Sequence, residues 1–354
     1  MVIVIKEFTK KDKIAQKLVI GIPDKKSIPG VLSLIKKYHI GGVILYKNNY
    51  DSLDELIKLI NLLKEANRDY EIPLAISIDQ EGGRANRLPL EINNIKSSYR
   101  LCNSGLNTVK DAASITADIL NKLGINMNFA PVLDIKKQKD NNFIGNRAYS
   151  SNIKEIIECG RVYCKELEKK NIIPVLKHFP GHGSVKFDSH FFLPVITKFS
   201  NNVADVKPFL ALMDEEAPAI MVSHILIRKY TNLKPASLSS NFIQNYIKKK
   251  LRYNGLLITD ELGMRSVRFF YGKYRSIKKA FIAGNDLICF KYKDGYIERV
   301  INELLTIDLD LEESFNKVVS YKKKYKYSDE EINFNINLKE LNAKIDEINN
   351  RKEN

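Results

Sequence analysis

The stretch Ile172-Ile173-Pro174-Val175-Leu176-Lys177-His178-Phe179-Pro180-Gly181-His182-Gly183 shows how this chain is built. Its first five residues are apolar and partly β-branched, as in a short strand buried inside a sheet. Lys177 and His178 stand where that strand ends. The proline and the two glycines that follow disfavour a helix and predict a sharp loop. The same unit, an apolar strand that ends in ionisable side chains, recurs along the chain.

Eight apolar runs alternate with helical patterns. The expected strands cover residues 17–21, 39–46, 73–79, 125–131, 172–178, 217–224, 255–260 and 286–290. The expected helices cover residues 29–37, 51–67, 108–123, 151–170, 202–214, 240–251 and 275–283. Most strand runs are continuously apolar, as expected when both faces of a sheet are covered. Eight such units predict a (β/α)₈ TIM barrel. A doubly wound open sheet is the alternative, weakened because no G-x-G-x-x-G follows a strand.

No linker divides the chain, so we expect a single domain with a C-terminal helical extension. Residues 1–335 are assigned to the barrel domain, and its first 16 residues are expected to be a lead-in with some helical character. The region 295–354 is predicted to be charged amphipathic helix, and within it residues 336–354 form a separate tail.

Composition and charge argue against a nucleic-acid-binding, membrane-spanning or secreted protein. The net charge is +15, but the lysines are spread along the 354 residues and mixed with acidic residues, so no nucleic-acid partner is expected. No run reaches the roughly 18 apolar residues of a membrane span, and residues 1–5 are too short for a secretory signal. We therefore expect a cytoplasmic protein. Its four cysteines form no C-x-x-C pair and are expected to be reduced thiols.

Polar side chains end several of the expected strands. The third strand ends in Asp79, the fourth in Asp134, the fifth in Lys177 and His178, the sixth in His224 and the seventh in Asp260. In a (β/α)₈ barrel these strand ends form one rim, where active sites lie. Each alone could be an ordinary loop residue, but together they predict a catalytic site.

Two of these groups have specific chemical uses. Asp260 directly follows an apolar strand, which would hold its carboxylate in place as a nucleophile. Asp188 and His190 lie two positions apart and share a side in extended chain, so the carboxylate can set the tautomer of the imidazole. His190 is then a candidate proton shuttle. His178 and His182 have the spacing of a zinc helix, but the proline between them argues against that helix, and no metal is expected.

These residues resemble glycoside hydrolase family 3, specifically its bacterial NagZ-type β-N-acetylglucosaminidases, which recycle peptidoglycan. The matching segments follow in family order: residues 78–84 with Arg87, 128–134, 145–150, 177–183 with Asp188-Ser189-His190, 221–224, 259–264 and 283–286. The segment Lys177 to Gly183 followed by Asp-Ser-His is highly specific to this group. The family fold is a (β/α)₈ barrel. The C-terminal tail lies outside the resemblance.

The resemblance implies a retaining, two-step hydrolysis of terminal β-linked N-acetylglucosamine from muropeptide-like sugars. Asp260 matches the nucleophile, and His190, oriented by Asp188 on a mobile loop, matches the acid/base. Asp79, Arg87, Arg147, Lys177 and His178 match positions that hydrogen-bond the sugar ring and its acetamide. The chain departs from the family at Asp260-Glu261, where Asp-Asp is frequent, and at Tyr149, where the family has Phe.

Three other functions stay open. A phosphorylase could use the same Asp–His pair with phosphate as the acceptor. The substrate acetamide could act as nucleophile with Glu261 as acid, although adjacent strand residues should face opposite ways. A non-catalytic sugar- or polyanion-binding barrel is the third. With the hydrolase reading we expect a small carbohydrate substrate, no cofactor, no membrane span and a monomer.

Overall fold

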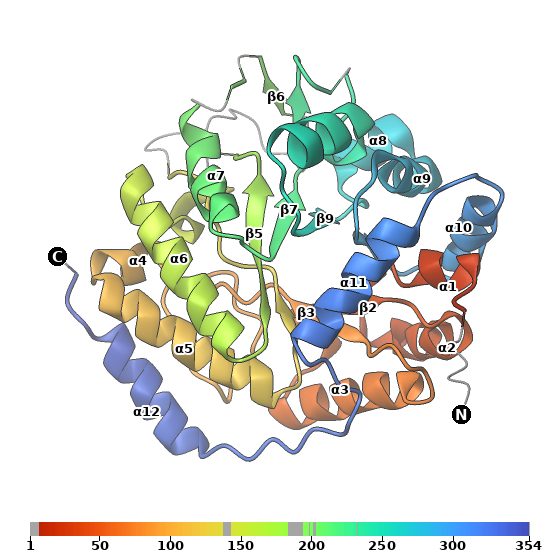
Figure 1. Ribbon diagram of the computed structural model, residues 1–354. Coiled ribbons are helices and arrows are strands. Elements are labelled where there is room, and N and C mark those ends of the chain that lie inside the picture. Colours follow the sequence, from red (N-terminus) through yellow and green to blue (C-terminus); the bar gives the residue numbers. More distant parts are fainter. Residues whose placement is uncertain are drawn as a thin grey trace, which may run out of the picture.

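Eight parallel strands make a sheet that curls into a barrel (Figure 1). The computed structural model describes residues 7–136, 143–182, 194–197, 199–200, 203–231 and 233–353. The barrel strands are β1 (Leu18–Gly21), β2 (Gly42–Leu45), β3 (Ala75–Ile78), β4 (Met127–Asn128), β5 (Ile173–Phe179), β7 (Ala219–Val222), β9 (Leu256–Thr259) and β10 (Ile288–Lys291). They pair in the order β10-β1-β2-β3-β4-β5-β7-β9. A parallel bridge between Ile258 and Leu287 brings β9 to β10 and closes the ring.

All eight predicted strands are present, and the predicted (β/α)₈ barrel is confirmed. Every residue of the first seven barrel strands is buried. One face fills the barrel interior with side chains such as Ile44, Phe129 and Ile258. The other face, with Ile20 and Val43 among its residues, packs against the helices. This two-sided burial is why the strand sequences are continuously apolar.

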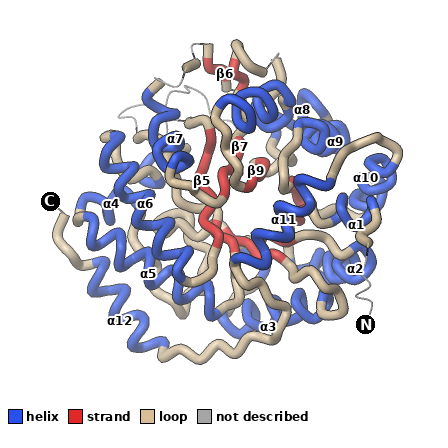
Figure 2. The backbone as a smooth tube through the Cα atoms, in the orientation of Figure 1, coloured by secondary structure: helices blue, strands red, loops and turns tan. Residues whose placement is uncertain are grey.

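Helices surround the strands (Figure 2). The helices before the C-terminal region are α1 (Lys10–Ala15), α2 (Ile28–Tyr38), α3 (Leu53–Asn67), α4 (Ser98–Asn103), α5 (Leu106–Lys122), α6 (Ile153–Lys169), α7 (Lys207–Asp214), α8 (Arg265–Tyr271) and α9 (Lys273–Ala283). A π-helix, η6 (Asn241–Lys250), takes the helical position between β7 and β9. The sequence did not predict α4, α8 or the small parallel pair of β6 (Val195–Ile196) and β8 (Leu226–Ile227).

Local signals explain where the predicted elements begin. The side chain of Ser52 accepts a hydrogen bond from the backbone N–H of Glu55 and starts α3. Pro29 lies in the first turn of α2, where its missing N–H costs little. The strand expected from residue 39 starts only at Gly42, because His39 adopts a left-handed conformation (φ 51°) that ends α2.

The C-terminal region corrects the prediction of helix over 295–354. It contains three helices, α10 (Tyr296–Leu305), α11 (Glu312–Lys324) and α12 (Leu338–Asn349), and residues 325–337 are not helical. The chain leaves the helical path there because Tyr325 and Tyr327 turn into the barrel interior. α12 lies along α5, near the C-terminus (Figure 1). The boundary between residues 335 and 336 stays a prediction.

α11 closes the end of the barrel where the strands begin, and in Figure 1 it crosses in front of the strands. Val318 of α11 packs with the interior cluster. The ammonium of Lys322 donates to Oε1 of Gln16 at 2.9 Å, to the carbonyl of Gly41 at 2.7 Å and to that of Pro73 at 2.8 Å. These acceptors precede β1, β2 and β3, so one side chain ties three strand starts together. We call this end of the barrel, α11 with Tyr325 and Tyr327, the floor.

Over the described ranges, no helix is both long enough and apolar enough to cross a lipid bilayer.

Candidate active site

The opposite end of the barrel carries a cavity of about 540 Å³. Because the strands are parallel, their carboxyl ends meet there, and we call this end the rim. Six of the eight predicted site residues line the cavity: Asp79, Arg87, Arg147, Lys177, His178 and Asp260. They come from β5 and from segments that follow β3, β4 and β9. The predicted pair Asp188 and His190 lies outside the described residues.

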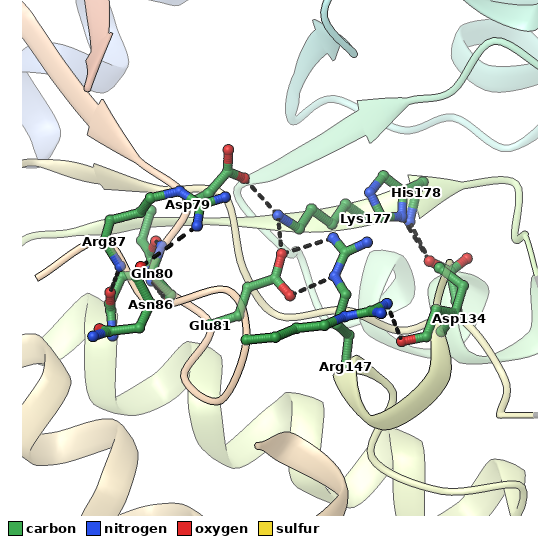
Figure 3. A network of polar contacts seen from close by, with 12 residues as sticks. Asp79, Gln80, Glu81, Asn86, Arg87, Asp134, Arg147, Lys177 and His178 are labelled. Carbon is green, nitrogen blue, oxygen red and sulfur yellow. Dashed lines mark hydrogen bonds and ion pairs between the residues drawn. The ribbon is translucent and has the colours of Figure 1, made fainter. Parts of the chain in front are cut away.

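A buried ion network forms one wall of this cavity (Figure 3). The ammonium of Lys177 lies 2.6 Å from Oδ1 of Asp79 and 2.5 Å from Oε1 of Glu81. Arg147 holds the other side of Glu81 with two hydrogen bonds of 2.7 Å, from Nε to Oε2 and from its terminal nitrogen to Oε1. Two carboxylates and two cations thus compensate one another. The network fixes Lys177 and Arg147 with little freedom to move, as orienting groups require.

Burial by itself would raise the pKa of Glu81, but Lys177 and Arg147 outweigh it and hold that pKa far below its usual range. Glu81 is therefore ionised at neutral pH. Arg84, which follows Glu81, donates to the carbonyls of Phe143 and Ile144. That contact holds the start of the segment that carries Arg147.

His178 is oriented by a second buried carboxylate. Nδ1 of His178 lies 2.7 Å from Oδ2 of Asp134, which is fully buried. Oδ1 of Asp134 accepts the backbone N–H of His182 at 2.6 Å. Because a carboxylate only accepts, the Nδ1 of His178 carries a proton, and Nε2 is the nitrogen left for a ligand. Burial opposes ionisation of Asp134, yet His178 and His182 lower its pKa.

The chain can make this turn because of Gly181. Its φ is +117°, and a Cβ at this position would lie 2.6 Å from the backbone oxygen of Asp205. The sharp loop predicted after β5 is present up to His182, where the described residues stop. His178 lies on β5 and His182 in the loop after it, so the two histidines do not share a helix, as the proline between them predicted. Within the described ranges, no group of three or more metal-binding side chains is assembled to hold a metal ion.

Asp260 sits just beyond the end of β9. Its backbone N–H donates to the carbonyl of Val222, and its Oδ1 accepts the N–H of Glu261 at 2.8 Å. Burial would raise the pKa of Asp260, but His224, His178 and the N–H of Glu261 lower it overall. The carboxylate is therefore ionised at neutral pH, the state that a nucleophile needs.

His224 holds the backbone next to Asp260. Its Nε2 donates to the carbonyl of Glu261 at 3.0 Å, and its Nδ1 accepts from the hydroxyl of Ser237 at 2.7 Å. Burial lowers the pKa of His224, and Asp260 and the carbonyl of Glu261 act against that shift. The doubly hydrogen-bonded imidazole fixes the turn after Asp260.

One expectation about Glu261 is wrong. Asp260 and Glu261 were expected to face opposite sides, but both line the cavity. The alternation of a strand does not apply because β9 ends at Thr259. Oε1 of Glu261 accepts the N–H of Gly263 at 2.7 Å, and burial raises the pKa of this carboxyl group. Orientation alone therefore does not exclude Glu261 from the chemistry.

The sequence reasoning gave no role to several residues of the cavity. Glu81 is one of them, and its burial and ion pairing became visible only in the structure. Asp134, already named at the end of the fourth strand, acts through His178, with which its buried carboxylate pairs. Tyr46 and Lys291 line the cavity from the ends of β2 and β10, with the ammonium 5.2 Å from the ring centre. The strand-end rule, applied to all eight strands, would have found both.

The fold and the cavity define a class. A (β/α)₈ barrel with buried carboxylates and cations around a rim cavity is the architecture of an enzyme that acts on a small polar substrate. Residues 9–321 match the family described as Glycosyl hydrolase family 3 N terminal domain. The chain therefore belongs to glycosyl hydrolase family 3.

Similar proteins agree with this family. The chain is 33% identical to a β-hexosaminidase of Psychromonas ingrahamii over 70% of its length and 74% of that protein. It is 31% identical to β-hexosaminidase A of Pseudoalteromonas piscicida over 73% of its length, but spans only 47% of that protein. A solved family 3 β-N-acetylglucosaminidase from Paenibacillus superposes with a TM-score of 0.89 at 28% identity, covering 97% of this chain and 68% of the other.

Proposed function

We propose that this protein is a retaining exo-β-N-acetylglucosaminidase that hydrolyses terminal β-linked N-acetylglucosamine. The observation that carries the proposal is the position of Asp260, an ionised carboxylate facing a cavity whose wall holds Asp79, Arg147 and Lys177. Charged hydrogen-bonding groups of this kind suit sugar hydroxyls and an acetamide. The β-hexosaminidase and β-N-acetylglucosaminidase names of the relatives support the same sugar.

In the first step, a carboxylate oxygen of Asp260 forms a bond to the anomeric carbon, and the bond to the leaving oxygen breaks. His190, held by Asp188, gives its proton to that oxygen. In the second step, His190 takes a proton from water while the water oxygen attacks the anomeric carbon and releases Asp260. Two inversions give net retention, with an Asp–His pair in place of the usual second carboxylate. The roles of Asp188 and His190 rest on the sequence resemblance.

We propose muropeptides derived from peptidoglycan as the natural substrates. Arg87 and Lys291 at the cavity wall support this, because their charges suit substrates that bear carboxylates. A cytoplasmic role in cell-wall recycling would follow and stays a prediction.

The test is a pair of chromogenic glycosides, the β-N-acetylglucosaminide and the β-glucoside, each with and without phosphate. We expect release from the N-acetyl substrate only, with free N-acetylglucosamine as product at both phosphate concentrations. Sugar-1-phosphate as the main product would replace hydrolysis by phosphorolysis. Equal rates on both glycosides would contradict the assigned sugar specificity.

A trapped intermediate tests the mechanism separately. A fluorinated glycoside slows the second step, so the peptide containing Asp260 should gain the mass of the sugar. An unmodified Asp260 under turnover conditions would favour the acetamide of the substrate as nucleophile, with Glu261 as acid.

A further inference from the structure

Two cysteines from α4 and α6 lie in contact with each other. Cys102 belongs to α4 and Cys159 to α6, and their sulfur atoms are 3.3 Å apart although the residues are 57 positions apart. Both thiols are free. A disulfide needs a sulfur separation of about 2.05 Å, so an approach of about 1.3 Å would join them.

The two thiols differ in access and in acidity. Cys102 is half-buried and reachable from solvent, whereas Cys159 is 3% exposed. The thiol contact lowers the pKa of Cys102, while the same contact and burial raise the pKa of Cys159. Because the thiolate is the nucleophile, Cys102 is the sulfur that would meet an oxidant first, and Cys159 lies ready as its partner.

Both helices support the polar wall of the cavity. α4 packs against η3 (Gly145–Arg147), the turn that carries Arg147. On α6, one turn after Cys159, the hydroxyl of Tyr163 donates to the backbone oxygen of Gln80 at 3.2 Å. Gln80 lies between Asp79 and Glu81 in the chain. A disulfide between α4 and α6 would therefore join the helix that packs against the Arg147 turn to the helix that holds the Asp79–Glu81 segment.

We propose that Cys102 and Cys159 form a reversible oxidation site, at which a hydroperoxide produces an intramolecular disulfide that joins α4 to α6. The thiolate of Cys102 attacks a peroxide oxygen, the O–O bond breaks, and water or an alcohol leaves. Cys102 is then a sulfenic acid. The sulfur of Cys159 attacks it, and its proton leaves with the hydroxyl group as water. Two thiols are oxidised, one peroxide is reduced, and a thiol reductant reverses the change.

The other two cysteines provide the control. Cys164 and Cys289 are buried, and in the described part of the chain neither has a sulfur within hydrogen-bonding distance. Burial raises the pKa of both thiols. Peroxide should therefore leave them unchanged at doses that oxidise Cys102.

The experiment treats the reduced full-length protein with hydrogen peroxide. We expect a mass loss of about 2 Da, a peptide pair linked through residues 102 and 159, and a melting temperature higher by about 5 °C, as closing a loop of this size implies. Amide exchange over residues 143–152 should slow, because η3 in this segment packs against α4 and the segment leads directly into α6. Dithiothreitol should restore the original mass and melting temperature.

Variants separate the pair from general oxidation. Cys164→Ser should still lose 2 Da, whereas Cys159→Ser should instead leave Cys102 as a sulfenic acid that dimedone labels. If Cys159→Ser does not fold, Cys102→Ser at the half-buried position replaces it as the test variant. After peroxide treatment, Cys102→Ser should not show the 2 Da loss. Over-oxidation of Cys102 without any linked peptide in the native protein would overturn the proposal. Unchanged amide exchange after linkage would overturn the coupling to the site.

Discussion

The rim and the floor of the barrel each bury a lysine, but the two ammonium groups have different kinds of hydrogen-bond partner. At the rim, Lys177 lies between the carboxylates of Asp79 and Glu81. At the floor, the contacts of Lys322 within the described part of the chain are to neutral oxygens, those of Gln16, Gly41 and Pro73. Burial lowers the pKa of Lys322 to about 7, with Asp329 acting weakly in the opposite direction.

This difference in partners distinguishes a ligand-binding site from a purely structural contact. Full charges are costly to bury unless they are paired, and the rim keeps two carboxylates and two cations in place beside an open cavity. Such an arrangement is ready for a polar ligand. Among the described residues, Lys322 forms no ion pair, and its hydrogen bonds fasten strand starts; the ion pair of the floor helix joins Lys317 to Asp286 instead. Changes at the rim should therefore alter catalysis, and changes at the floor should alter stability.

The largest effect is expected at Asp260. Asp260→Asn removes the nucleophile while keeping the shape of the side chain, so kcat should fall by at least about 1,000-fold. The free energy of unfolding should change little. Steady-state kinetics with the chromogenic N-acetylglucosaminide and a urea titration measure the two quantities. Activity within tenfold of the native protein would remove Asp260 from the mechanism.

The next effect is expected at Lys177. Lys177→Met keeps the length of the side chain but leaves Asp79 without its cation, so kcat/KM should fall by about 100-fold. Stability should fall less than for an orphaned charge, because Arg147 still holds Glu81. The exposed Lys293 supplies the control, and Lys293→Met should keep native kinetics. If Lys177→Met lost stability but kept kcat/KM, Lys177 would be a structural residue like Lys322.

At the floor the pattern should reverse. Lys322→Ala removes a buried donor from the carbonyls of Gly41 and Pro73, of which the Gly41 carbonyl keeps the N–H of Ala75, so the free energy of unfolding should fall by about 2–3 kcal/mol. The activity of the folded fraction should stay within twofold. Lys323→Ala, one residue further on and exposed, should change stability by less than about 0.5 kcal/mol. Equal unfolding curves for the two variants would show that the Lys322 contacts contribute nothing.

The smallest effect concerns pH and His182. Burial lowers the pKa of His182 to about 4, below the roughly 6.5 of an unfolded histidine. Between these values the unfolded chain binds a proton and the folded chain does not, so stability falls as pH falls from about 6.5 to 4. Urea titrations should show His182 contributing a loss of about 1–2 kcal/mol between pH 7 and pH 5. His182→Asn should flatten that slope, and an identical slope would contradict the assignment.

Much of the candidate site could be predicted because strand ends can be located from the sequence. Asp79, Lys177 and Asp260 each follow an apolar run, and parallel strands bring their ends to one rim. Side-chain directions beyond a strand could not be predicted in this way. Glu261 was assigned to the wrong side because the alternation of the strand stops at Thr259. Glu81 received no role because its two cations arrive from segments about 66 and 96 positions away in sequence.

The sequence by itself determined the eight buried strands and the family, since apolar periodicity and short motifs are local properties that one chain segment carries alone. The tertiary structure decided which charges meet, how α11 fills the floor and that Cys102 touches Cys159. Those contacts join segments distant along the chain, and their strength depends on burial and distance. Neither quantity is set until the barrel has closed.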